Sequence, residues 1–282
     1  MARQRMRYIT LPSGDEMPVL GQGTWFMGER NSDLKQEIHT LQQGIERGLS
    51  LIDTAEMYAD GGAEKIVGAA IKGRRDEVFL VSKVLPGNAS LKGTMDACEA
   101  SLRRLGTDYI DLYLLHWRGR IPLAETAEAM ENLVEQGKIG QWGVSNFDVD
   151  DLEELMTIVG HEQVATNQVL YNLSRRGIEY DLLPWCRSNS MPVMAYSPIE
   201  QARLLEHPAL IEVALRHRVS PAQIAIAWVL HDHNVITIPK AANVQHMLEN
   251  IESLSIELSH EDYVTLNAAF PPPARKTPLE ML

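Results

Sequence analysis

The sequence predicts an α/β protein built as a single (β/α)8 barrel with a β-hairpin at its N-terminal side. Short apolar runs alternate with longer segments of helical periodicity through the 282 residues, and no Pro/Ser/Gly-rich linker interrupts them. Parallel strands that are buried on both faces have this continuous apolar character. Eight such repeats suffice to close a barrel, so residues 1–282 are expected to form one domain. The predicted strands are residues 19–23, 49–53, 78–83, 110–116, 140–144, 164–167, 193–196 and 235–238.

Local signals predict several element boundaries. Residues 8–19 carry a turn signal at 13–15 (Ser-Gly-Asp), which predicts a hairpin ahead of the first barrel strand. Asp148 is a predicted helix N-cap, with Leu152 on the inner face of the helix that follows. Gly137 comes after a segment whose apolar positions recur every three or four residues, and glycine at such a point typically ends a helix.

A doubly wound dinucleotide-binding fold is the main structural alternative. That fold places G-x-G-x-x-G directly after its first strand, with the third glycine inside a helix. Here Gly21 and Gly23 are present, but Phe26 occupies the third position and the chain continues into Met27-Gly-Glu. The pattern therefore favours the barrel.

Composition excludes some classes of partner. The 26 Lys and Arg against 38 Asp and Glu give a net charge of -12, which opposes general binding to nucleic acid or to anionic membranes. The most apolar stretch, residues 222–230, is too short to span a bilayer, and no signal-peptide pattern precedes Pro12. Cys98 and Cys186 lack the spacing of a metal site or a disulfide framework. A cytoplasmic protein without a metal is expected.

Ionisable side chains stand at the ends of three consecutive predicted strands. Asp53, Lys83 and His116 each follow an apolar run, and Tyr58 lies five residues beyond Asp53. Taken singly, each is more often a surface charge or a hydrogen-bonded packing residue. In a barrel, however, the carboxyl ends of the strands share one mouth, where active sites form. An acid, a base and an imidazole at that mouth indicate a catalytic site.

Eight short fragments form a pattern that extends along nearly the whole chain. The fragments are Gly21-Gln-Gly-Thr-Trp25, Asp53-Thr-Ala-Glu-Met-Tyr58, Lys83, Leu114-Leu-His-Trp117, Gly143-Val-Ser-Asn-Phe147, Asn167-Gln168, Tyr196-Ser-Pro198 and Ile238-Pro-Lys240. In the order and spacing of these fragments the sequence resembles the aldo-keto reductase family. The resemblance implies hydride transfer between NADPH and a carbonyl carbon, without metal or flavin.

The resemblance also implies catalytic roles. Tyr58 corresponds to the general acid, Lys83 and Asp53 to the pair that tunes it, and His116 to the residue that orients the carbonyl. A tyrosine with a pKa near 10 is a weak acid at neutral pH, and a neighbouring ammonium is expected to lower that pKa. Neutral His116 would donate a hydrogen bond to the substrate oxygen as negative charge develops there.

The cofactor and substrate contacts are carried over in the same way. Ser145, Asn146 and Gln168 correspond to the nicotinamide carboxamide set, and Tyr196 to the ring on which nicotinamide stacks. His246 stands where many members have arginine. Because imidazole is mostly neutral at physiological pH and lacks the bidentate fork, NADPH is expected to be preferred only moderately, with NADH possible but weaker. The full expected set is Thr24, Ser145, Asn146, Gln168, Tyr196, Ser197, Lys240, His246, Glu249 and Asn250 for the cofactor, with Trp25 and Trp117 walling the substrate pocket.

Two departures from the family pattern bear on the mouth. The family often continues Ser-Pro-Leu-Gly after the stacking tyrosine, whereas this chain has Ser197-Pro198-Ile199-Glu200, which leaves the path of that loop open. The segment after Phe270 is short and rich in proline, so it is expected to cover little of the mouth. An open mouth has few contacts with which to reject one side chain over another.

The resulting hypothesis is an NADPH-dependent reductase of small reactive aldehydes, with 2-oxoaldehydes such as methylglyoxal as candidate substrates. A regulatory module that keeps the fold and the cofactor site without turnover is the alternative. A metal-dependent barrel hydrolase is disfavoured, because His231-Asp-His233 follows a helical pattern and is typical of a helix end. The chain is expected to act on a small aldehyde or ketone, as a monomer or a weak homo-oligomer.

Overall fold

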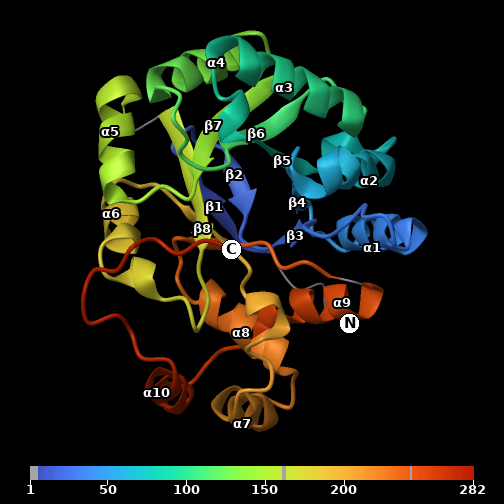
Figure 1. Cartoon of the computed structure of the whole chain (residues 1–282). Coiled ribbons are helices and arrows are strands. Elements are labelled where there is room, and N and C mark those ends of the chain that lie inside the picture. The colour runs from blue at the N-terminus through green and yellow to red at the C-terminus, as the bar shows by residue number, and fades with distance from the viewer. Residues whose placement is uncertain (1–5, 161–162, 242) are drawn as a thin grey trace.

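The computed structural model describes residues 6–160, 163–241 and 243–282, and these form a parallel barrel enclosed by helices (Figure 1). Eight strands hydrogen-bond in chain order from β3 to β10. Every pair between them is parallel, as the predicted βα repeat requires. The strands are β3 (Gly21–Gly23), β4 (Leu51–Asp53), β5 (Phe79–Val84), β6 (Ile110–Leu115), β7 (Ile139–Ser145), β8 (Val164–Leu170), β9 (Val193–Tyr196) and β10 (Val235–Thr237).

The barrel closes where its first and last strands meet. A parallel bridge joins Leu20 to Thr237, and the Thr237 amide donates to the carbonyl of Val19 at 2.8 Å. Close backbone approach at this seam depends on Gly23, because a Cβ at that position would stand 2.5 Å from the carbonyl oxygen of Ile238. The (β/α)8 prediction is confirmed.

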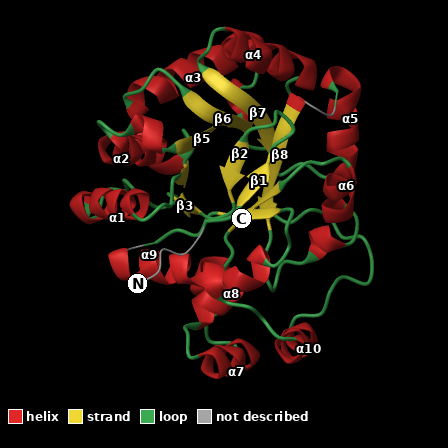
Figure 2. Cartoon of the chain, turned by 180° about the vertical axis from the view of Figure 1, so that it is seen from behind, coloured by secondary structure: helices red, strands yellow, loops and turns green. Residues whose placement is uncertain are grey.

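Helices form the outer layer of the barrel (Figure 2). The predicted cap at Asp148 is present as a capping box, and Gly137 has the positive φ of 68° that suits glycine just beyond a helix end. No helix in the described part of the chain is long and apolar enough to cross a membrane. The helices are α1 (Leu34–Glu46), α2 (Gly62–Ile71), α3 (Leu91–Leu105), α4 (Leu123–Glu135), α5 (Val149–Val159), α6 (Leu182–Ser188), α7 (Pro208–His217), α8 (Pro221–Leu230), α9 (Val244–Glu252) and α10 (His260–Ala269).

The predicted hairpin closes one end of the barrel. Strands β1 (Tyr8–Thr10) and β2 (Glu16–Pro18) pair antiparallel around the turn at residues 11–15. Leu11 and Met17 are buried in one apolar cluster with side chains of the barrel interior, including Leu51 and Leu112. The hairpin therefore fills the amino ends of the strands, and the carboxyl ends remain as the mouth.

The segment after α10 departs from its prediction. Residues 271–282 run in extended form from α10 past α6 to the centre of the barrel mouth, where Met281 and Leu282 line the cavity (Figure 1). The expectation that this segment covers little of the mouth was wrong. An extended chain advances about 3.3 Å per residue, so even a short segment crosses a barrel. The sequence shows that the segment is short, but it does not show the contacts that hold the segment at the mouth.

Candidate active site

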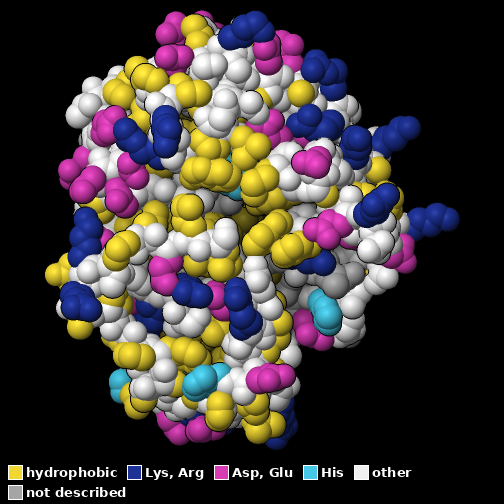
Figure 3. All heavy atoms as spheres, viewed as in Figure 1, with side chains coloured by type: hydrophobic (Ala, Val, Ile, Leu, Met, Phe, Trp, Pro, Cys, Tyr) yellow, Lys and Arg dark blue, Asp and Glu magenta, His cyan; other side chains and the backbone are white. Residues whose placement is uncertain are grey.

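The mouth of the barrel holds a cavity of about 670 Å³, within the range of small-ligand sites. Hydrophobic side chains surround the hollow on this face (Figure 3). The cavity brings together twelve of the predicted site residues: Thr24, Trp25, Asp53, Tyr58, His116, Trp117, Ser145, Asn146, Gln168, Tyr196, Ser197 and Lys240. It also contains residues that the sequence did not single out, among them Phe26, Met57, Gln201, Met281 and Leu282.

Lys83 lies behind the cavity wall and joins two of its residues. Its side chain is fully buried, and Nζ donates to Asp53 Oδ2 at 2.8 Å, to the Thr54 carbonyl at 2.9 Å and to Tyr58 Oη at 3.2 Å. Strand ends β4 and β5 are neighbours in the barrel, which is why Asp53 and Lys83 meet. A buried ammonium with three acceptors fixes the position of the phenol.

The loop that carries Tyr58 is held from two sides. Glu56 Oε1 accepts a hydrogen bond from the Leu85 amide at 2.7 Å, which ties the loop to the end of β5. Directly after Tyr58, the backbone of Ala59 and of Asp60 has φ of 50° and 51°, a conformation that residues other than glycine rarely adopt. Such backbone persists where surrounding contacts enforce it.

The electrostatics of Tyr58 differ from the expectation. Burial, followed by the nearby Asp53 carboxylate, raises the pKa of Tyr58 well above its ordinary value of 10. Burial lowers the pKa of Lys83, while the Asp53 carboxylate opposes that shift. The predicted lowering of the tyrosine pKa was therefore wrong for the free protein, since burial of the phenolate and the Asp53 carboxylate both raise it. The phenol keeps its proton at neutral pH.

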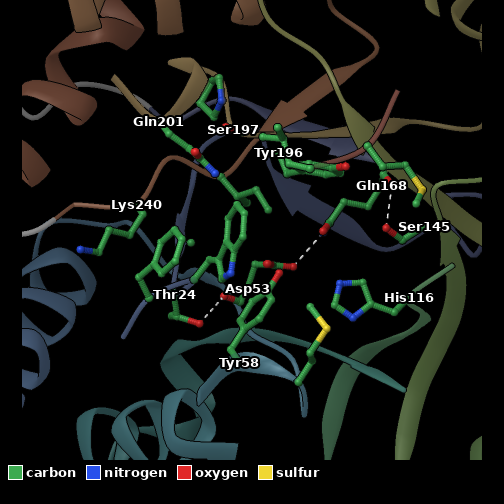
Figure 4. A pocket seen from close by; sticks show the side chains of 18 of the residues that line it. Thr24, Asp53, Tyr58, His116, Ser145, Gln168, Tyr196, Ser197, Gln201 and Lys240 are labelled. Carbon is green, nitrogen blue, oxygen red and sulfur yellow. Dashed lines mark hydrogen bonds between the residues drawn. The ribbon is translucent and has the colours of Figure 1, made fainter. Parts of the chain in front are cut away.

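His116 faces Tyr58 across the floor of the cavity (Figure 4). The ring centroids are 5.8 Å apart in an edge-on arrangement, and the histidine is 7% exposed. Burial, with a further contribution from the Lys83 charge, lowers the pKa of His116 to about 3. Within the described chain, His116 Nδ1 is buried without a hydrogen-bond partner. The imidazole is therefore neutral at physiological pH, as the sequence predicted.

Amide and hydroxyl side chains line the opposite wall. Gln168 Nε2 donates to Asp53 Oδ1 at 2.8 Å, which connects this wall to the Lys83–Asp53 pair. Ser145 Oγ donates to the Gln168 carbonyl at 2.8 Å, and Tyr196 Oη donates to Asn146 Oδ1 at 3.0 Å. Ser145 ends β7, Asn146 follows it directly and Gln168 lies within β8, so the barrel itself fixes these three residues.

The loop after β9 takes a path that the sequence left open. Glu200 does not line the cavity; its carboxylate accepts from Arg175 Nε and Nη2 at 3.0 and 2.8 Å. Gln201 lines the cavity instead and, like Lys240, lies on the side away from His116 (Figure 4). The Glu200 carboxylate therefore forms an ion pair and does not face the cavity.

Three predicted cofactor residues lie outside the cavity. His246, Glu249 and Asn250 belong to α9, beyond the exposed Lys240. His246 is exposed, and its backbone amide donates to Asn243 Oδ1, the N-cap of that helix. Among the described residues no group of three or more His, Cys, Asp or Glu side chains is placed to hold a metal ion.

The barrel holds a buried phenol, a buried ion pair and a neutral imidazole at one mouth, as an enzyme of the (β/α)8 class does. Residues 19–270 match the model of the aldo/keto reductase family. The chain belongs to this family.

Relatives with known names agree with this assignment. The chain is 55% identical to the methylglyoxal reductase YeaE of Escherichia coli, over 96% of this chain and 97% of that protein. It is 35% identical to the glyoxal reductase of Bacillus subtilis, over 92% and 91%. An aldo/keto reductase from Klebsiella pneumoniae, solved with NADP and acetate, is similar with a TM-score of 0.95 and 51% identity, over 99% of this chain and 100% of that one.

Proposed function

We propose that this protein is an NADPH-dependent reductase of small aldehydes, including 2-oxoaldehydes such as methylglyoxal, and that it uses NADH less well. The observation that carries the proposal is the contact of 3.2 Å between Tyr58 Oη and the buried Lys83 Nζ, beside the neutral His116. The names of the Escherichia coli and Bacillus subtilis relatives support the substrate class. NADP in the Klebsiella structure supports the cofactor.

The donor set at the mouth fits a nicotinamide cofactor. A carboxamide needs donors and acceptors together, and the side chains of Ser145, Asn146 and Gln168 offer both. The half-buried Tyr196 ring at the end of β9 offers a flat surface for stacking. We assign the remaining contacts, from the nicotinamide end to the adenosine end, to Thr24, Ser197, Lys240, His246, Glu249 and Asn250.

Residues of this chain then supply the proton and hold the carbonyl. NADPH, when bound, supplies the hydride. Tyr58 keeps its proton in the buried site and donates it from Oη to the carbonyl oxygen. Lys83, 3.2 Å away, stabilises the phenolate that remains, and Asp53 keeps the ammonium charged. Neutral His116 donates a hydrogen bond to the same oxygen. Trp25 and Trp117 enclose the substrate and limit access of water.

The test is oxidation of NADPH against a panel of aldehydes and ketones by the wild type and by Tyr58→Phe. The variant loses only the phenolic oxygen, so turnover should fall by about 10²–10⁴-fold while cofactor binding persists. Tyr180→Phe is the matched control, because Tyr180 is half exposed and lies outside the cavity. Wild-type-like turnover in Tyr58→Phe would remove the acid assignment. NADPH binding without turnover of any carbonyl would favour the regulatory alternative.

The remaining assignments concern cell biology and assembly. We propose a cytoplasmic enzyme that works as one barrel domain over residues 1–282, as a monomer or a weak homo-oligomer. Both cysteines, Cys98 and Cys186, are free and buried, and this suits a reducing compartment. The acidic net charge supports a small-molecule substrate over a nucleic-acid or membrane partner.

A further inference from the structure

One arginine outside the cavity contacts both of the segments that cover it. Arg175 donates from Nε and Nη2 to Glu200 in the loop after β9, and from Nη1 to Glu280 at 2.6 Å. We infer that Arg175 is a positioning residue that couples the cofactor-side loop, residues 197–202, to the segment 271–282, so that the two cover the mouth as one unit. This rests on the proposed function, because the loop lies where the cofactor would bind.

The cofactor-side loop needs an anchor of this kind. Ser197, Glu200, Gln201 and Ala202 all have positive φ, between 49° and 70°. Four non-glycine residues in this region within one loop are strained, and such strain persists where neighbouring contacts over-determine the backbone. Residues of the same loop line the cavity, so its conformation shapes the site directly.

The segment around Arg175 supplies that anchor at two points. Asn172 Nδ2 donates to the Ser197 carbonyl at 2.9 Å and to Glu200 Oε2 at 2.8 Å, while Arg175 binds the other carboxylate oxygen. The Glu200 side chain is only 5% exposed. A buried carboxylate held by an amide and a guanidinium is a strong contact, so the loop follows the position of Arg175.

The second partner of Arg175 is weaker and easier to release. The Glu280 side chain is 43% exposed, so solvent competes for it. Met281 and Leu282 follow immediately and line the cavity, so this ion pair fixes where they enter the mouth. Another ion pair, from Lys276 to Asp181 at 3.2 Å, holds the middle of the segment. The Glu280 contact is thus the point where the covering segment would detach.

Coupling follows from the shared guanidinium. Loss of the ion pair with Glu280 allows the Arg175 guanidinium to move. Because the guanidinium also binds Glu200, this movement displaces the strained loop. Because coupling between two sites is reciprocal, a cofactor held under the loop would in turn favour the docked position of residues 271–282. Arg175 itself does not line the cavity.

The experiment compares Glu280→Gln with the wild type by NADPH fluorescence titration and by amide hydrogen exchange of residues 199–202 without cofactor. Glu153→Gln is the control, because it removes one exposed carboxylate far along the chain. We expect Glu280→Gln to weaken NADPH binding by about 2- to 5-fold, the range of one exposed ion pair, and to speed exchange in the loop. Its KM for aldehydes should also rise.

A second background isolates Arg175. In the double variant Arg175→Met/Glu200→Gln no buried carboxylate is left unpaired, and there Glu280→Gln should have no further effect on either readout. An additional loss in that background, or no change of either readout in Glu280→Gln beyond Glu153→Gln, overturns the inference. If the double variant does not fold, the comparison of Glu280→Gln with Glu153→Gln alone tests the inference. Failure of the wild type to bind NADPH would sink the proposed function, and the exchange arm would still test the coupling.

Discussion

His116 should cost the folded protein stability below neutral pH, and His116→Gln should remove that cost. Burial and the Lys83 charge lower the pKa of His116 to about 3 in the folded state, whereas a histidine in an unfolded chain titrates near pH 6.5. Between these values the unfolded state binds more protons, so the free energy of unfolding falls as the pH falls. The slope approaches about 1.4 kcal/mol per pH unit, which gives about 2 kcal/mol at pH 5.

Urea unfolding of the wild type and of His116→Gln, each at about pH 7.5 and about pH 5, measures this term. Other groups titrate in both proteins, so the change with pH in the difference between the two free energies reports His116. That difference should shift by about 2 kcal/mol in favour of the variant at the lower pH. His39→Gln serves as the control, since that side chain is exposed. An equal pH dependence of wild type and His116→Gln would show that the buried imidazole gains its proton without penalty.

Two further predictions concern charges at the mouth. Lys83→Met should lower the free energy of unfolding by about 3–5 kcal/mol, because it leaves the Asp53 carboxylate buried without its counter-charge. Adding Asp53→Asn to Lys83→Met should recover part of that loss. Urea unfolding of the single and the double variant tests both statements. His246→Arg should tighten NADPH by about 1–2 kcal/mol and leave NADH nearly unchanged if the side chain meets the 2′-phosphate. An NADPH affinity of His246→Arg equal to that of the wild type would place His246 outside the site.

The site residues at the ends of strands could be predicted from the sequence. Apolar runs of strand length end in Asp53, Lys83 and His116, and barrel topology requires those ends to share one mouth. Tyr58 was harder, because a loop residue has no periodicity, and its role came from the family resemblance. The direction of its pKa shift was also out of reach, because the burial of the phenol and the nearby Asp53 carboxylate both raise the pKa and neither can be judged without the structure.

The contacts that hold residues 271–282 at the mouth could not be predicted, because they join residues far apart in the chain. Arg175 and Glu280 are 105 residues apart, and nothing in either local sequence marks them as partners. The adjacent Arg175 and Arg176 match no motif in the sequence, yet both hold the chain near the mouth: Arg176 Nη1 donates to the Phe270 carbonyl at 2.6 Å. Short polar motifs of this kind become informative only when the fold supplies the second partner.

The hairpin that fills the base of the barrel has a consequence for the order of folding. Strands β1 and β2 precede every barrel strand in the chain, yet Met17 belongs to one buried apolar cluster with side chains from strands as late as β10. A two-stranded hairpin alone is marginal in water. During synthesis it must therefore wait, unprotected, until the last strand is in place, and its docking and the closing of the seam between Leu20 and Thr237 should occur together as a late, non-local step.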